Sequence, residues 1–315
     1  MNHKPEKILH GHFPAMFSGL RWLITMVLMV AACSSAFSQQ QRFPYDLDNP
    51  SEKHILPTIL EEISGNSLLN DHIMICVQDE KGDLFFYNLE ERRLIKRVDF
   101  GKDADYEDVT LIGDEAWVLR SNGTLYRIRY FDDEDRIETR EIKTALSGKN
   151  NCEGLCYDPV ENRLLIALKG KPEINDEQDF DGYKAIYAFD PETEKLSEEP
   201  AYLIELKQIK DLENASLYEQ ISHKIAATLE ESDDIRFQPS AVGVHPETDD
   251  IYVLASVGKA LVVMSREGKL AQINPLDKWL FVQPEGICFS PDGTLFISSE
   301  GDGGNGLILR FDMKK

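Results

Sequence analysis

Short apolar runs with alternating polar positions follow one another along most of this chain. In "LYRIRY" (125–130) apolar side chains fall on every second position over most of the run, as on a half-buried β-strand, and "IYAF" (186–189) is another short run of β-type residues. Clusters of Asp, Asn, Gly and Pro separate the runs, as in "SPDGTL" (290–295), and such clusters are typical of turns. The pattern predicts many short antiparallel strands and an all-β fold.

A unit of four such runs recurs along the chain. The residues that lead the units, with spacings of 45, 46, 87 and 45, are Glu62, Glu107, Glu153, Ser240 and Glu285. Four-stranded propeller blades recur at roughly 40 to 50 residues, so the long interval fits one blade plus an insertion. The spacing predicts a five-bladed β-propeller.

The long interval contains "ELKQIKDLENASLYEQISHKIAATLEE", in which apolar residues recur at helical spacing. We therefore expect a helical insertion after the third blade, at about residues 205–231. A sixth blade in this interval is the alternative, but the segment lacks β-branched runs and turn signals.

The last unit stops after three strands, and segment 43–60 precedes the first unit. This segment can supply the missing outer strand, which closes the ring and removes free sheet edges. Residues 39–315 are therefore expected to form one domain.

The first 38 residues have the pattern of a secretory signal peptide. Lys4, Lys7 and Arg21 precede an apolar run at 22–32, which is too short to span a membrane as a helix. Two cleavage sites are open: "VAAC" resembles a lipobox that places a lipid on Cys33, and "AFS" resembles an ordinary signal peptidase site. Both predict an exported protein, in the periplasm or on the outer membrane, with membrane contact only through a lipid anchor.

The chain carries 34 basic and 56 acidic residues, a net charge of −22. So acidic a body repels nucleic acid and anionic membrane surfaces, and both are excluded as partners. It is compatible with divalent cations, although solubility alone accounts for most of the charge. We expect a monomer whose partner is a small molecule or a protein of unknown identity.

The recurrence suggests why acids lead the units. In a propeller the first strand of each blade lines the central channel, and the loops before the first strand and after the second open on the same face. The leading residues should therefore meet, at one mouth of the channel, those that follow the second strands: Asp79, Arg120, Lys169, Ser256 and Glu300.

Carboxylates gathered around one axis repel one another unless a positive charge lies among them. One interpretation is a calcium ion, which accepts six to eight oxygen ligands in loose geometry. Its candidate ligands are Glu62, Glu107, Glu153, Glu285 and Glu300, with ligand-binding residues beside them at Asp79, Arg120, Lys169, Ser240 and Ser256. Two other interpretations remain: Arg120 and Lys169 neutralise the acids directly, or each acid bonds turn amides within its own blade.

Several stretches, in this order, resemble the SdiA-regulated family of exported propellers, which is related to NHL-repeat proteins: "EISG", "VQDE", "CEGLCYDP", "FQPSAVGVHPETDDIYVLAS" and "QPEGICFSPDGTLFISSEG". The resemblance implies a five-bladed propeller, exported or membrane-attached, with a bound calcium ion and no established reaction. The Glu-Gly position of the family maps onto Glu153-Gly154 and Glu285-Gly286, and its Glu-Ile-Ser-Gly onto Glu62. Ser240 departs from the pattern.

Two functions compete. The first is a calcium-stabilised binding module that takes a ligand or protein at the channel mouth. The second is a calcium-dependent hydrolase of lactones or phosphate esters, in which a metal polarises the substrate and a carboxylate activates water. No Ser-His-Asp arrangement is evident, and His245, at a strand-to-turn junction, is expected at the surface. Binding is therefore the favoured hypothesis, because a metal site alone is not a reaction.

Overall fold

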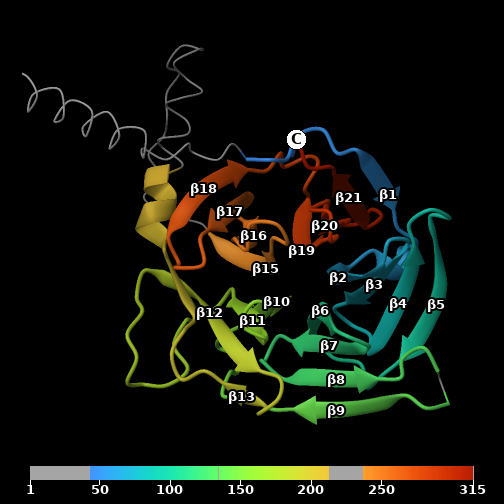
Figure 1. The fold of residues 1–315 in the computed structure, drawn as a ribbon, viewed down its shortest axis with the longest axis horizontal. Coiled ribbons are helices and arrows are strands. Elements are labelled where there is room, and N and C mark those ends of the chain that lie inside the picture. Colours follow the sequence, from blue (N-terminus) through green and yellow to red (C-terminus); the bar gives the residue numbers. More distant parts are fainter. Residues whose placement is uncertain (1–42, 134, 213–236, 315) are drawn as a thin grey trace, which may run out of the picture. The chain divides into compact units, whose positions relative to one another are not determined.

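The computed structural model describes residues 43–133, 135–212 and 237–314. Within these ranges the chain forms five antiparallel sheets, and Figure 1 shows them arranged around a central axis. The predicted all-β, five-bladed propeller is confirmed. No helix of the described residues is long and apolar enough to cross a membrane.

The blades follow the chain in order. Blade 1 contains β2 (Ile63–Asn70), β3 (Ile73–Gln78), β4 (Asp83–Asn88) and β5 (Arg93–Asp99). Blade 2 contains β6 (Tyr106–Ile112), β7 (Glu115–Arg120), β8 (Leu125–Arg129) and β9 (Glu138–Ile142). Blade 3 contains β10 (Cys152–Asp158), β11 (Arg163–Leu168) and β12 (Tyr183–Asp190), with β13 (Lys195–Leu196) and β14 (Tyr202–Glu205) both paired to β12.

Blade 4 contains β15 (Gln238–Val244), β16 (Ile251–Val257), β17 (Ala260–Met264) and β18 (Leu270–Pro275). Blade 5 contains β19 (Gln283–Phe289), β20 (Leu295–Glu300), β21 (Leu307–Phe311) and β1 (Glu52–Ile55). The strand β1 comes from the other end of the chain and pairs antiparallel with β21, as in Glu52 opposite Arg310. The expected closure of the ring by segment 43–60 is therefore present, and a 3-10 turn at Thr58–Leu60 leads from β1 into blade 1.

The five inner strands β2, β6, β10, β15 and β19 contact one another in sequence around the axis, and β19 contacts β2. Because β10 contacts β15 directly, there is no place for a sixth blade between blades 3 and 4. Residues 206–212 are helical and begin the expected insertion, whose residues 213–231 lie outside the described ranges. The predicted signal peptide 1–38 and Cys33 also lie outside them.

The burial pattern explains the order of strands within a blade. In β11 five consecutive residues are buried, because blades pack against both faces of a middle strand. In β5, an outer strand, exposed and half-buried positions alternate over most of its length. Middle strands such as β11 therefore contain near-continuous apolar runs, and the outer strand β5 shows the alternation of a half-buried surface.

The expectation for His245 was wrong. The side chain is fully buried, and its Nε2 lies 2.8 Å from the Tyr45 hydroxyl. The backbone N–H groups of Glu247 and Thr248 donate to its Nδ1, at 3.2 and 3.3 Å. The histidine side chain folds back over its own turn, and Tyr45, from the segment before β1, packs against it. This contact joins distant parts of the chain, so no local sequence pattern indicates it.

Candidate functional site

All five inner strands carry an irregularity of pairing near their first residues. The register shifts between Tyr106 and Asp108, between Cys152 and Gly154, and at equivalent places in β2, β15 and β19. Such a bulge leaves one residue unpaired and redirects its side chain. The unpaired residues of blades 2 to 5 are Glu107, Glu153, Ser240 and Glu285, the leading residues that the sequence singled out.

Blade 1 differs in detail. Its bulge spans Ser64 and Gly65, between Ile63, paired with Gln78, and Asn66, paired with Cys76. Glu62 precedes β2 and is exposed. The structural counterpart of the leading acids in blade 1 is therefore the pair Ser64-Gly65, which begins two residues after Glu62.

The glycines after the bulges have a packing role. A Cβ atom on Gly154 would lie 2.7 Å from the backbone nitrogen of Val242 in the neighbouring blade. One on Gly286 would lie 2.3 Å from Oδ1 of Asn66 in blade 1. Glycine at these positions lets adjacent inner strands approach closely around the axis, so the repeated Glu-Gly pair combines a channel-facing acid with a packing requirement.

The end of the propeller at which the inner strands begin, here called the acid end, holds most of the predicted residues. Glu153 and Glu285 are 5% and 6% exposed, and Glu107 is half-buried. Lys169, just after β11, places its Nζ 3.2 Å from Oε1 of Glu153. Burial opposes a charge on Lys169, but Glu153, Glu285 and Glu107 outweigh that effect and raise its pKa. The lysine is therefore an ammonium ion among carboxylates.

The carboxylates have strongly perturbed acidities. Burial raises the pKa of Glu285 to about 8, and the charge of Glu153 adds to the rise. Burial raises the pKa of Glu300, at the end of β20, to about 7, with help from Asp79. Burial and then Glu153 raise the pKa of Glu107 well above its ordinary value. Isolated carboxyl groups ionise near pH 4, so burial together with neighbouring carboxylates favours the protonated form of Glu107 and Glu285 at neutral pH and brings Glu300 to its midpoint there.

The residues two positions before the leading residues also contribute to the acid end, although the repeat pattern was not used to select them. The Asn151 side-chain amide donates to Oε1 of Glu153 at 2.7 Å, and that of Gln283 donates to Oε2 of Glu300 at 2.5 Å. In blade 2 the same position is Asp105, whose charge raises the pKa of Glu107 further. The sequence signal was present, because Asp105, Asn151, Gln238 and Gln283 all stand two residues before a leading residue.

The other predicted residues lie on the same strand ends. Asp79 follows β3, and burial raises its pKa to about 6, with Glu62 adding to the rise. Arg120 ends β7, and its Nε atom is buried without a hydrogen-bond partner among the described residues, as is Oδ1 of Asp79. The Ser240 hydroxyl donates to the Pro284 carbonyl at 2.7 Å. Ser256, in β16, is buried.

A further lysine belongs to the acid end. Lys259, in the β16–β17 turn, donates from its Nζ to the Val282 carbonyl at 2.5 Å. Burial lowers its pKa, and Glu285 and Asp302 act against that effect. No repeated position marks Lys259 in the sequence, because it stands in a turn outside the repeat pattern.

The donor chemistry of the acid end suits a hard cation, since its buried side chains offer carboxylate and amide oxygens. Within the described residues, however, no group of three His, Cys, Asp or Glu side chains is arranged to hold a metal ion. As the side chains lie here, the ammonium of Lys169 supplies the nearest positive charge to Glu153. Calcium binding therefore requires the glutamates to turn towards a common point.

The fold and this ring of inner strands define a five-bladed β-propeller whose inner strands begin among buried carboxyl groups. The fold is similar to that of Myxococcus xanthus glutaminyl cyclase, with 13% identity over 85% of this chain and 97% of that chain and a TM-score of 0.53. A virginiamycin B lyase from Staphylococcus aureus matches with 11% identity over 82% of this chain and 68% of that chain, at a TM-score of 0.43. A streptogramin B lyase matches with 12% identity over 83% and 97%, at 0.46.

At these identities the likeness concerns the propeller fold alone. No protein-family model matches the sequence, and no curated protein matches it either.

Proposed function

We propose that this chain is an exported binding module of the SdiA-regulated type, whose acid end holds a calcium ion and receives a small-molecule or protein ligand. The observation that carries the proposal is the surplus of buried carboxyl groups over positive charges at this mouth. Glu107, Glu153 and Glu285 all have raised pKa values, and the charge of Lys169 acts against the rise in each. A divalent cation ionises these groups and removes the cost of burying them.

The same three glutamates are the proposed calcium ligands, with backbone carbonyl groups and water completing the shell that calcium prefers. Arg120 and Asp79, each with an unpartnered buried atom, are the proposed contacts of the ligand beside the ion. Export and a lipid on Cys33 belong to the same proposal and are supported by the pattern of residues 1–38.

Metal-free protein titrated with calcium or magnesium chloride tests the proposal, with melting temperature and heat of binding as readouts. We expect calcium to bind and raise the melting temperature, with a dissociation constant of about 10⁻⁴ M, and magnesium to act less. Glu153→Gln and Glu285→Gln should lose the response. Glu138→Gln, an exposed change on the outer strand β9, should keep it. No response to millimolar calcium would refute the metal part of the proposal.

A second function is favoured by a specific observation. Glu285 and Glu300 have pKa values of about 8 and about 7, the range in which a carboxyl group exchanges protons with a substrate at neutral pH. This pair suits a hydrolase of lactones or phosphate esters. Turnover of such substrates that is abolished both by chelator and by Glu300→Gln would establish catalysis. Absence of turnover in a calcium-loaded protein would leave binding as the function.

A further inference from the structure

A cavity of about 470 Å³ opens at the other end of the channel. Its wall comes from the later halves of all five inner strands and from the turns that follow them. Apolar side chains dominate it, one from each blade being Leu69, Leu111, Tyr157, Val244 and Phe289. This cavity, here called the funnel, has the size and lining of a small-molecule site.

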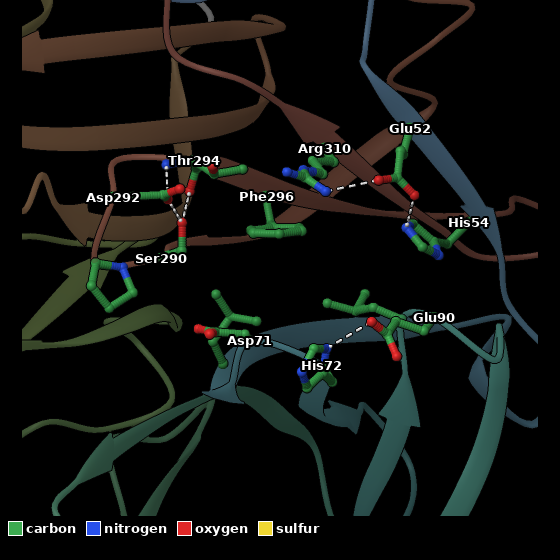
Figure 2. Close-up of a pocket in the computed structure, with 13 residues that line it drawn as sticks. Glu52, His54, Asp71, His72, Glu90, Ser290, Asp292, Thr294, Phe296 and Arg310 are labelled. Atoms are coloured by element: carbon green, nitrogen blue, oxygen red, sulfur yellow. Dashed lines mark hydrogen bonds and ion pairs between the residues drawn. The ribbon is translucent and has the colours of Figure 1, made fainter.

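A second cavity, of about 500 Å³, lies between blades 5 and 1 and is here called the side cleft. Figure 2 shows Asp71 and His72 from blade 1 on one wall, with Ser290 and Arg310 from blade 5 on the other. Leu68, Asp71, Ser290 and Pro291 line both cavities. The two cavities therefore share a border, and together they form one site with an apolar part and a polar part.

Most charges of the side cleft are already compensated. Arg310 donates to Glu52 at 2.7 Å, and Arg92 approaches the same carboxylate at 3.4 Å. His72 lies 3.1 Å from Glu90. These ion pairs, drawn in part in Figure 2, lie within the wall of the side cleft, and the cavity in front of them stays open.

The border carries uncompensated negative charge. Asp71 is exposed at the β2–β3 turn, and its carboxylate forms no hydrogen bond or ion pair with any residue that the structure describes. Asp249, on the funnel wall, is likewise without a side-chain partner in the described ranges. Hydrogen bonds from Ser290 and Thr294, with the charge of Arg310, lower the pKa of Asp292, which adds a further carboxylate to the side cleft. An apolar cavity with an anionic edge complements a cation that carries an apolar body.

We propose that the funnel and the side cleft together bind an amphiphilic small molecule with an apolar body and a cationic head. The body lies in the funnel, and the head lies at the border beside Asp71. This site is at the opposite end of the channel from the acid end, and it does not depend on calcium.

Three probes with the same ten-carbon tail test the proposal on the mature chain, each below its micelle concentration. They are decyltrimethylammonium, decyl maltoside and decyl sulfate, and their affinities are measured by calorimetry. We expect saturable binding of the cationic probe, about fivefold tighter than the neutral one, with the anionic probe weakest. Equal affinities for the three heads, or no saturable binding, would overturn the proposal.

Matched variants locate the site. Asp71→Asn should remove the preference for the cationic probe, whereas Asp114→Asn, in the equivalent turn of blade 2 and outside both cavities, should keep it. Leu111→Ser should weaken all three probes by a similar factor. Glu285→Gln should change none of them, which separates this result from the calcium proposal. A loss of binding in Glu285→Gln, or equal behaviour of the two aspartate variants, would contradict the assignment.

Discussion

The two ends of the channel are built from the same five strands and have opposite chemistry. At the acid end, Glu153 and Glu285 are buried with raised pKa values. At the funnel, side chains such as Leu111 and Phe289 line an apolar cavity. The difference arises in the backbone, because bulges lie at the starts of the strands and the later halves are largely regular.

A bulge frees one side chain from the alternation that a regular strand imposes. It thereby lets an acid face the axis without placing polar residues in the core between blades. The residue after the bulge is glycine in blades 3 and 5, because the adjacent inner strand leaves no room there for a side chain. The chemistry of the acid end therefore depends on local backbone irregularity, and that of the funnel depends on ordinary strand packing.

Gly154→Ala is the change with the largest expected effect on this comparison. The added methyl group would meet backbone atoms of Ala241 and Val242 at 2.7 to 2.8 Å, and backbone cannot move aside cheaply. We expect a loss of about 3 kcal/mol in the free energy of unfolding, measured by denaturant titration. Gly148→Ala is the matched control, since its methyl group meets nothing within 4 Å. Equal stability of the two variants would show that close strand approach does not require the glycine.

Glu285→Gln tests the electrostatics of the acid end. The folded-state pKa of about 8 exceeds the ordinary value of 4.5, so the unfolded chain releases this proton at lower pH. The contribution of Glu285 to stability is therefore present below about pH 4.5 and is lost as pH rises to about 8. In metal-free protein we expect the glutamine variant to be more stable than the parent above pH 8, by on the order of 3 kcal/mol.

The check is a series of melting curves from pH 4 to 9. The parent should lose stability across this range more steeply than Glu285→Gln, and Glu138→Gln should follow the parent. Parallel pH profiles for the parent and Glu285→Gln would mean that this carboxyl group ionises normally.

Tyr45→Phe has the smallest expected effect and concerns the funnel end. The Tyr45 hydroxyl donates to the Gly293 carbonyl at 2.6 Å and meets Nε2 of His245 at 2.8 Å. Losing it should cost about 1 kcal/mol, measured by denaturant titration. The loss should leave calcium binding at the acid end unchanged. A change in calcium affinity would mean that the two ends are coupled.

The repeat allowed much of this molecule to be predicted from its sequence. The spacing of the leading residues gave the number of blades, and the three-strand last unit gave the closure by β1. The repeated Glu-Gly pair marked Glu153 and Glu285, which the bulges leave unpaired beside the axis. These features are local and recur, so one sequence carries several copies of the same signal.

The rest depends on contacts that no local pattern records. Leu111 and Phe289 read as ordinary core positions, and only the assembled ring shows that they border a cavity. His245 was placed at the surface because its partner Tyr45 stands 200 residues away. The counterpart of the leading acids in blade 1 was assigned to Glu62, but the bulge of that strand holds Ser64 and Gly65, and Glu62 stands before the strand.

The most direct test of the central claim is a titration of the glutamate carboxyl carbons by ¹³C NMR, with and without calcium. Glu107 and Glu285 should keep their protons at neutral pH, and Glu300 should be half protonated, until a cation reaches them. In metal-free protein we expect glutamate resonances that titrate at or above pH 7, and we expect these titrations to move to lower pH when calcium is added. A spectrum in which every glutamate titrates below pH 5.5 without metal would contradict it.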